Sequence, residues 1–496
     1  MINIFDKISG FFKKNQKVFF IISMLFFVTV TIIGVIVHEP WYDEAQSWLI
    51  AQDLNFFEIL KQMRYEGHLF LWYLLLMPLA KLNCPYPISM QIVNLLFIWF
   101  AVYVMWKKLP LNPFFKVLIT FSAPICYQYA VVARCYSIGI FLLFLLTAYY
   151  KEKLNKPYLY SALIFLCANT SSLALIGATA FGIAFFVEYI RNNKTFFKTK
   201  EFWNLAAIAF ITIFSILYQW HGTLSYLPVL DNLEGRNTSV IVVFWAIVEG
   251  LFNIEDKEAF DIPLLIGSLY IILSILGYKK SKNSLFIFLF TFFGLFVLFI
   301  FLYNGSIFHH HFYYIYFIIS VCIYNLYQEK KDVFYYLLIT FFIVVSAQLV
   351  YVNFDFYYNE DINYDFSNDK KVMEIIEQDE NLRNSDIFVC DMFSLSVIPY
   401  LKAKGIDVKT CYNDKNKFFW DHATRESYGL DEGILLKEEL QKYLRKKVYL
   451  ISSYLYCRDI PNEYQDTYKI ETYKNIDRGY EQPTSTVIWE LTPIDK

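Results

Sequence analysis

The hydrophobic and polar positions divide the chain at about residue 353. Before that point, apolar runs of roughly 20 residues, long enough for a membrane-spanning helix, alternate with short polar connections. We predict about eleven spans, and they cover residues 18–37, 88–106, 114–132, 135–150, 157–172, 173–190, 201–219, 259–277, 283–303, 312–327 and 333–353. The pattern therefore predicts a polytopic α-helical membrane domain over residues 1–353.

Two further apolar runs, at 69–82 and 238–252, are too short to span comfortably, so we predict interfacial helices there. Counting 69–82 as interfacial places every basic connection on one side of the membrane. These connections contain Lys107, Lys108, Lys151, Lys153, Lys156, Arg191, Lys194, Lys198, Lys200, Lys279, Lys280, Lys282, Lys330 and Lys331. Basic loops stay in the cytoplasm, so the N-terminus is predicted inside and the C-terminus outside.

The chain becomes polar from about residue 354. Short β-type runs at 386–390, 406–411, 447–453, 468–473 and 485–491 surround a predicted helix at 393–404. We therefore predict that residues 354–496 form a small α/β domain on the extracytoplasmic side.

Composition agrees with a membrane protein, since 57% of the residues are hydrophobic and only 18% are charged. The net charge of −2 gives no overall field that would attract nucleic acid. The eight cysteines form no CxxC pair or metal-type spacing, so a zinc or redox centre is disfavoured. The basic N-terminal stretch and first apolar run lack a small-residue cleavage site, so we expect a retained helix.

An acidic pair, Asp43 and Glu44, follows the first predicted span. A carboxylate beside a low-dielectric wall can deprotonate an acceptor hydroxyl or amine, and its neighbour can orient it or bind a cation. The structural alternative is an acidic pair that only keeps the loop in water. We interpret both residues as catalytic candidates.

Glu66 and His68 lie two residues apart in the next outer loop and could share a metal ion or steady a phosphate. The alternative is a turn at Gly67 with His68 as a polar anchor at the membrane surface. A divalent metal cofactor therefore remains an open possibility from the sequence.

Arg134 is a single cation between two apolar runs on the predicted outer side, against the positive-inside trend. We expect a phosphate or a carboxylate from the first loop to compensate its charge. Snorkelling to lipid head groups is the structural alternative.

Three consecutive histidines, His309, His310 and His311, lie at another predicted outer helix end. Neighbouring side chains point in different directions, so at most one or two can converge on one ligand. We interpret His309 and His310 as helix-end polar groups that contact phosphate or acceptor, in preference to a metal site.

Three segments together resemble a known superfamily: 41–45 (WYDEA), 67–73 (GHLFLWY) and 133–137 (ARCYS). The chain resembles the C-type (GT-C) membrane glycosyltransferases, and is most similar to family 39-like enzymes such as protein O-mannosyltransferases and the aminoarabinose transferase of lipid A. The likeness covers about residues 18–150 and is only topological beyond them.

The resemblance implies an inverting transfer from a polyprenyl-phosphate sugar donor to an extracytoplasmic acceptor, which is a protein, a lipid or a glycan of the cell envelope. It implies Asp43 as the general base, and we add Arg134, Tyr136 and His68 as groups that hold the donor phosphate. Two rival functions remain: a lipid or polysaccharide transporter or flippase, and a non-catalytic envelope scaffold. A transporter is expected to carry polar residues at mid-membrane depth, whereas polar groups here cluster at the outer helix ends.

Overall fold

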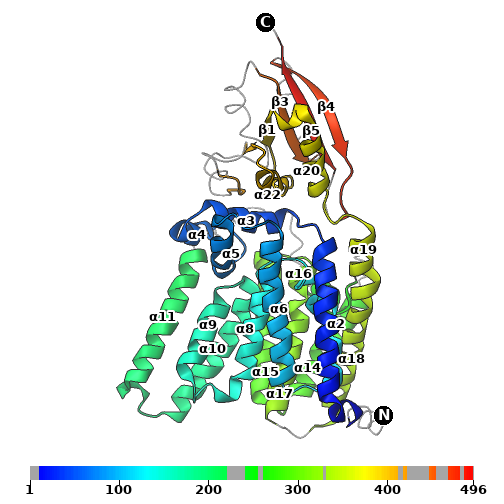
Figure 1. The fold of residues 1–496 in the computed structure, drawn as a ribbon. Coiled ribbons are helices and arrows are strands. Elements are labelled where there is room, and N and C mark those ends of the chain that lie inside the picture. The colour runs from blue at the N-terminus through cyan, green and yellow to red at the C-terminus, as the bar shows by residue number, and fades with distance from the viewer. Residues whose placement is uncertain are drawn as a thin grey trace.

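A computed structural model describes residues 10–220, 241–254, 261–327, 331–410, 417–421, 446–453, 467–480 and 485–494. Figure 1 shows a bundle of long, nearly parallel helices with a small sheet-containing domain standing on one end. The N-terminus lies at the opposite end of the bundle (Figure 1).

Eight helices in the described part of the chain are long and apolar enough to cross a membrane. They agree with eight of the predicted spans and support a multi-pass membrane protein. They are α2 (Gln16–Val37), α6 (Ile88–Lys108), α10 (Ser172–Asn192), α11 (Lys200–Trp220), α14 (Asp261–Tyr278), α15 (Lys282–Val297) with the π-helical turn η4 (Leu298–Leu302), α16 (Ile307–His310) with α17 (Phe312–Leu326), and α18 (Val333–Val352). The number of crossings and their orientation stay predictions.

The other three predicted spans are shorter than expected. The first breaks into α7 (Pro113–Phe121) and the π-helical turn η1 (Pro124–Gln128), because Pro124 lacks the N–H that a continuous helix needs there. The next two shorten to α8 (Tyr136–Ala148) and α9 (Pro157–Ala168). Both stand among the long helices of the bundle (Figure 1).

Short helices cover the end of the bundle that carries the sheet domain: α3 (Tyr42–Asp53), α4 (Phe56–Gln62) and α5 (Leu71–Lys81) (Figure 1). The two runs predicted to be interfacial become α5 and α13 (Ile241–Phe252), and both are too short to span, while residues 238–240 lie outside the described part. Single 3-10 turns, η2 (Tyr150–Glu152) and η3 (Phe196–Lys198), join the longer helices.

The last long helix continues past residue 353, where we predicted its end. It runs from α18 through the π-helical turn η5 (Asn353–Tyr357) into α19 (Tyr358–Asn363). The polar residues of this segment are therefore helical and bring Asp361 to the end of the bundle that carries the sheet domain.

The C-terminal region folds around one sheet, and its strands lie where the alternating pattern predicted them. The strands are β1 (Asp386–Val389), β2 (Lys409–Thr410), β3 (Val448–Ser453), β4 (Tyr468–Ile476) and β5 (Thr486–Pro493). Their order is β2-β1-β3-β5-β4, with β1 parallel to β2 and β3 and the other pairs antiparallel. The helices of this region are α20 (Asp369–Gln378), α21 (Glu380–Arg383) and α22 (Val397–Ala403).

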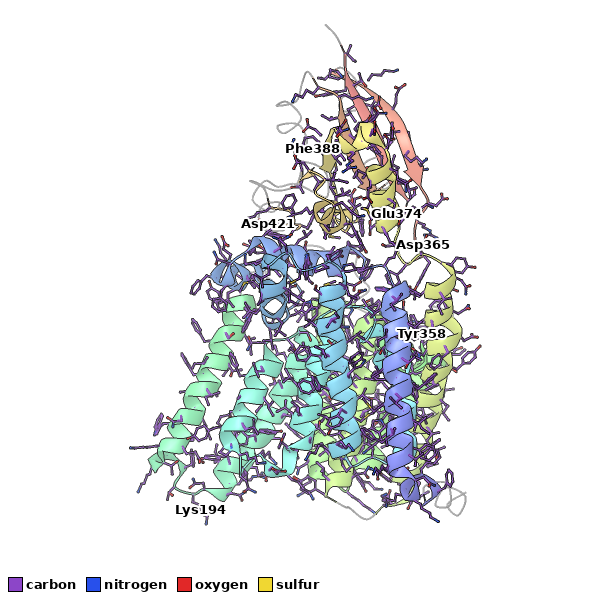
Figure 2. All side chains as sticks on the ribbon, in the orientation of Figure 1. Lys194, Tyr358, Asp365, Glu374, Phe388 and Asp421 are labelled. Atoms are coloured by element: carbon purple, nitrogen blue, oxygen red, sulfur yellow. The ribbon has the colours of Figure 1, made fainter. Side chains whose placement is uncertain are left out.

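The C-terminal region is fastened to α3, the helix that begins with Asp43. The carboxamide of Gln46 donates to the Trp420 carbonyl at 2.9 Å and accepts the Trp420 N–H at 2.7 Å. The Asp53 carboxylate accepts the Phe418 N–H at 2.6 Å. In Figure 2, Asp421 lies beside the layer of short helices. Hydrogen bonds from the C-terminal region therefore hold α3 in place on the side that faces away from the bundle.

Candidate active site at the capped end of the bundle

Three of the predicted site residues meet around Arg134. Its Nη1 lies 2.9 Å from Asp43 Oδ2, and its Nη2 donates to His68 Nε2 at 2.8 Å. The Asp43 side chain is 32% exposed and that of Arg134 is 11% exposed, so a ligand can reach the pair without unfolding. A first-loop carboxylate was one of the two partners expected for Arg134.

The neighbouring Glu44 faces the other way, because consecutive helical side chains point about 100° apart. It is fully buried, and Oε1 accepts the Ala133 N–H at 2.7 Å. Oε2 receives His38 Nε2 at 3.1 Å and the Trp41 N–H at 3.3 Å. We predicted a catalytic role for Glu44, and this geometry instead supports a positioning role: Asp43 holds Arg134 while Glu44 holds the residue before it.

His38 links this network to the last long helix. Its two ring nitrogens contact Glu44 at 3.1 Å and Asp361 at 3.3 Å, and all three side chains are buried. Burial alone would lower the pKa of His38, but the carboxylates of Asp361 and Glu44 override it and raise the pKa to about 10. A buried imidazolium therefore ties the ends of α2, α3 and α19 together.

His68 is placed by backbone pairing with the turn between α9 and α10. It forms an isolated antiparallel bridge with Ser171, and the Leu69 N–H donates to the Thr170 carbonyl at 3.3 Å. Burial and the adjacent Arg134 guanidinium lower the pKa of His68 well below its usual value. Because Arg134 can only donate, the neutral ring accepts at Nε2 and carries its hydrogen on Nδ1. Nδ1 is buried and has no partner among the described residues.

Tyr136 connects Arg134 to the histidine cluster. Its ring lies beneath the guanidinium, 5.4 Å from Arg134 Cζ, and its hydroxyl lies 2.9 Å from His309 Nε2. The Ser306 N–H donates to His309 Nδ1 at 3.1 Å, so the neutral ring carries its hydrogen on Nε2 and donates it to Tyr136. The hydroxyl hydrogen of Tyr136 is thereby left available for a further acceptor.

The remaining histidines lie apart from the Arg134 cluster. His310 Nδ1 contacts Glu249 Oε2 at 2.9 Å, and Nε2 contacts the Asn304 carbonyl at 2.8 Å. His311 Nδ1 contacts the Gly250 carbonyl at 2.8 Å. His310 was predicted to contact phosphate or acceptor, but in the structure both of its nitrogens join α13 to the turn before α16. Only His309 of the three is bonded to the cluster.

Glu66 is buried beside the cluster, not bonded to it. Its Oε1 accepts from Gln46 Nε2 and Gln62 Nε2, both at 3.2 Å. Burial is the main cause that raises the pKa of Glu66 to about 7, and nearby Asp43 and Asp421 add to it. The Nε2 atom of His68 is bonded to Arg134, and no group of three His, Cys, Asp or Glu side chains that could hold a metal ion is found in the described ranges. The predicted Glu66–His68 metal site thus has no geometric support.

Tyr303 is a residue that the sequence argument missed. Its ring packs edge-on against His309, with centroids 5.0 Å apart. Partial burial, and after it the Asp43 carboxylate, raises the pKa of its hydroxyl. The residue is 46% exposed, so it forms part of the accessible wall of the cluster. It is one of 40 tyrosines, and nothing in its local sequence distinguishes it from those in the membrane.

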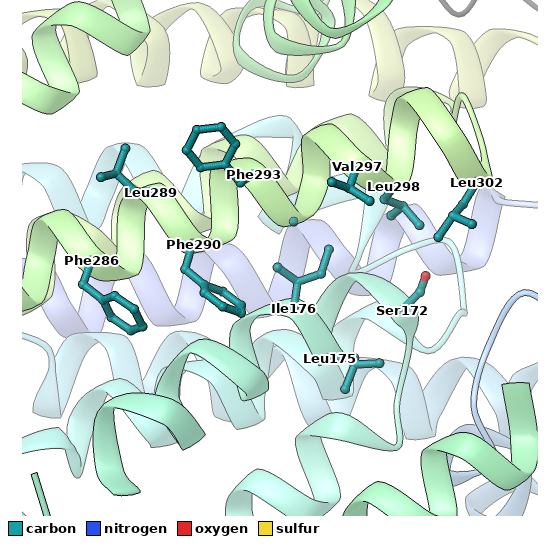
Figure 3. A pocket seen from close by; sticks show the side chains of 11 residues that line it. Ser172, Leu175, Ile176, Phe286, Leu289, Phe290, Phe293, Val297, Leu298 and Leu302 are labelled. Atoms are coloured by element: carbon teal, nitrogen blue, oxygen red, sulfur yellow. The ribbon is translucent and has the colours of Figure 1, made fainter. Parts of the chain in front are cut away.

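An apolar groove leads away from the cluster between α10 and α15. It encloses about 560 Å³ and has one polar side chain, Ser172, in its lining (Figure 3). Ser172 and Leu302 lie at one end of the groove and Phe286 at the other (Figure 3). Ser172 follows Ser171, the partner of His68, and Leu302 precedes Tyr303, so this end of the groove adjoins the polar cluster.

No family model and no curated protein matches the chain. Among solved structures, it is similar to "Crystal Structure of ArnT from Cupriavidus metallidurans in the apo state", with 10% sequence identity and a TM-score of 0.39. That similarity covers 94% of this chain and 97% of the other. A likeness at this level identifies neither a family nor an activity, so the function rests on the site.

Proposed function

We propose that the protein is an integral membrane glycosyltransferase of the GT-C type that moves a sugar from a polyprenyl-phosphate donor to an acceptor outside the cytoplasm. The observation that carries the proposal is the contact of Arg134 with both Asp43 and His68, beside the end of an apolar groove. A base, a set of phosphate-binding groups and a route for a lipid chain then occur at one place.

The groups around Arg134 suit a phosphate, because they offer hydrogen-bond donors. Arg134 supplies a guanidinium, which binds phosphate oxygens in a planar, bidentate manner. The tautomers inferred above leave the Nδ1 hydrogen of His68 and the hydroxyl hydrogen of Tyr136 without an acceptor among the described residues. A donor phosphate accepts from these three groups, and His309 orients Tyr136 for the purpose.

Asp43 is the proposed general base. A phosphate bound to Arg134 competes for the guanidinium and releases the carboxylate to face the acceptor. Asp43 then removes the proton from the acceptor hydroxyl or amine as its oxygen or nitrogen attacks the anomeric carbon. The bond between that carbon and the phosphate oxygen breaks, the electron pair leaves with the phosphate, and the configuration inverts.

The groove between α10 and α15 is the proposed path of the polyprenyl chain. Its aliphatic and aromatic lining provides no partner for a charged or hydrogen-bonding ligand apart from Ser172 at the polar end. A lipid chain lying along the groove therefore delivers its phosphate beside His68 and Arg134.

The first test measures binding of undecaprenyl phosphate to the purified full-length protein in lipid nanodiscs. We expect Arg134→Gln to weaken binding about 10- to 100-fold, the loss of a charge-assisted hydrogen bond worth about 1.5–3 kcal/mol. Arg64→Gln is the matched control, because Arg64 lies at the same end, bonded to the Tyr218 carbonyl at 3.0 Å and outside the cluster. Equal affinity of Arg134→Gln and wild type would remove the phosphate assignment.

The second test follows radiolabelled sugar from a panel of polyprenyl-phosphate monosaccharides into membranes from a strain that lacks this protein. Such membranes supply the acceptor. We expect Asp43→Asn to bind undecaprenyl phosphate normally and to lose transfer by at least 100-fold. Normal transfer by the folded variant would eliminate Asp43 as the base.

A further inference from the structure

A pocket of different chemistry lies at the opposite end of the bundle, where α2 begins and α6 ends. It encloses about 370 Å³. Four lysines, one amide and two aromatic side chains line it: Lys13, Lys14, Lys17, Lys107, Gln16, Phe20 and Trp106. The N-terminus marks this end in Figure 1, far from the site and from the C-terminal region.

The first lysines are held in place and do not belong to a loose tail. Residues 10–14 are helical, and Phe12 stacks on Phe19 with centroids 4.2 Å apart. Phe12 also meets Phe114 of α7 edge-on at 5.2 Å. These contacts fix the backbone that carries Lys13 and Lys14 against the bundle.

The floor of the pocket is also fixed. Trp106 is 1% exposed, and its indole N–H donates to Thr120 Oγ1 at 3.0 Å. Its carbonyl accepts from the buried Lys116 ammonium at 2.7 Å, which adds a further positive charge behind the pocket. Lys107 Nζ lies 3.9 Å from the centre of the Phe20 ring. Aromatic surfaces at the base and cations at the rim give the pocket an amphipathic character.

The positive charge of the pocket is not neutralised within the described part of the chain. Lys13, Lys14, Lys17 and Lys107 form no ion pair with any described carboxylate. Some lysines outside the pocket are paired, as Lys153 is with Glu188 at 2.7 Å. Four like charges around one pocket repel each other, and an anion bound among them relieves that repulsion.

We propose that this pocket binds the phosphate headgroup of an anionic membrane lipid. The pocket lies at the ends of two membrane helices, where a headgroup resides, and basic pockets between helices on the cytoplasmic side suit such groups. The half-buried Phe20 ring receives the glycerol and upper acyl region, with Trp106 packed behind it, while the lysine ammonium groups contact the phosphate. This site is separate from the proposed transferase site and does not depend on it.

The experiment measures lipid bound to the purified full-length protein by native mass spectrometry, with phosphatidylglycerol and phosphatidylcholine as probes. The pocket variant is Lys13→Gln, Lys14→Gln and Lys17→Gln combined. The matched control removes three exposed lysines at the same end of the bundle, where Lys194 is labelled in Figure 2: Lys194→Gln, Lys198→Gln and Lys200→Gln. A third variant changes the three pocket lysines to arginine.

We expect wild type to retain phosphatidylglycerol at least tenfold better than phosphatidylcholine. The pocket variant loses this preference at least tenfold, the control variant changes it less than threefold, and the arginine variant retains it. Equal losses in the pocket and control variants would overturn the proposal, because a general surface field would then explain the preference.

Inorganic phosphate distinguishes a lipid headgroup from a free anion. We expect 10 mM phosphate to displace little phosphatidylglycerol, since the aromatic floor contributes only to lipid. Complete displacement at that concentration would show an anion site without lipid selectivity and would also overturn the proposal. The arginine variant keeps the charge that guides membrane insertion, so it tests the proposal even where the glutamine variant does not fold: loss of the phosphatidylglycerol preference in the folded arginine variant would overturn the proposal.

Discussion

Asp43 and Glu44 are adjacent, but we predict different effects when each is changed to its amide: Glu44→Gln lowers the stability of the protein, whereas Asp43→Asn lowers transfer and leaves the stability nearly unchanged. Glu44→Gln acts on a network in which the His38 and Glu44 side chains are both fully buried. Glutamine has one acceptor oxygen, so it cannot serve Ala133 N–H on one side and His38 with Trp41 N–H on the other. Removing one partner of a buried ion pair lowers the free energy of unfolding by about 3–5 kcal/mol.

Asp43→Asn removes a pair that is partly exposed, with side chains 32% and 11% accessible. Such a pair contributes about 1 kcal/mol or less, because solvent screens it. The two substitutions therefore differ by at least about 2 kcal/mol in stability, although the residues are adjacent. At an unfolding entropy of about 2.1 cal/mol/K per residue, a chain of 496 residues shifts by about 1 °C per kcal/mol, so Glu44→Gln lowers the unfolding temperature by roughly 3–5 °C and Asp43→Asn by about 1 °C or less.

The assay is thermal unfolding of the purified protein in one detergent, followed by intrinsic fluorescence at a single scan rate, since membrane-protein unfolding is often irreversible. Donor-lipid binding is measured on the same samples below the unfolding transition. Equal unfolding temperatures for the two variants would refute the division of roles, as would a larger loss for Asp43→Asn.

Three further predictions concern stability and domain contact. The pKa of His38 is about 10 in the folded protein and 6.5 in the unfolded chain, so the stabilisation that the protonated ring provides is complete below about pH 6.5 and is lost as the pH rises through 10. Wild type should therefore lose more thermal stability between pH 7 and pH 10 than His38→Gln does. An equal loss in the two proteins would count against the buried imidazolium. Gly250→Ala should lower the unfolding temperature by about 1–3 °C, because a Cβ there would lie 2.1 Å from the His310 carbonyl oxygen and such overpacking costs about 1–3 kcal/mol. Gly182→Ala, whose nearest contact would be 3.8 Å away, should be neutral or stabilising. Gln46→Ala removes both hydrogen bonds to Trp420. If their loss costs roughly 1.4 kcal/mol, trypsin should release the C-terminal region about ten times faster. An unchanged digestion rate would show that these hydrogen bonds do not hold that region in place.

The sequence by itself determined the elements whose burial pattern is local. Apolar runs of membrane length identified the eight long helices, and alternation located the strands of the C-terminal sheet. It also singled out Asp43, His68 and Arg134, because charged or polar groups at apolar helix ends are costly unless they pair or act. Where the local signal was interrupted, as at Pro124, the predicted helix was too long.

The tertiary structure decided which of these polar groups face each other. Asp43 and Glu44 are equivalent in sequence terms, and only the packing of α3 against the Arg134 loop turns one toward the accessible cluster and the other into the interior. The partners of His38 and His310, Asp361 and Glu249, lie 323 and 61 residues away along the chain. No local pattern encodes such pairings, because they depend on how distant helices cross and on the free energy of satisfying buried charges together.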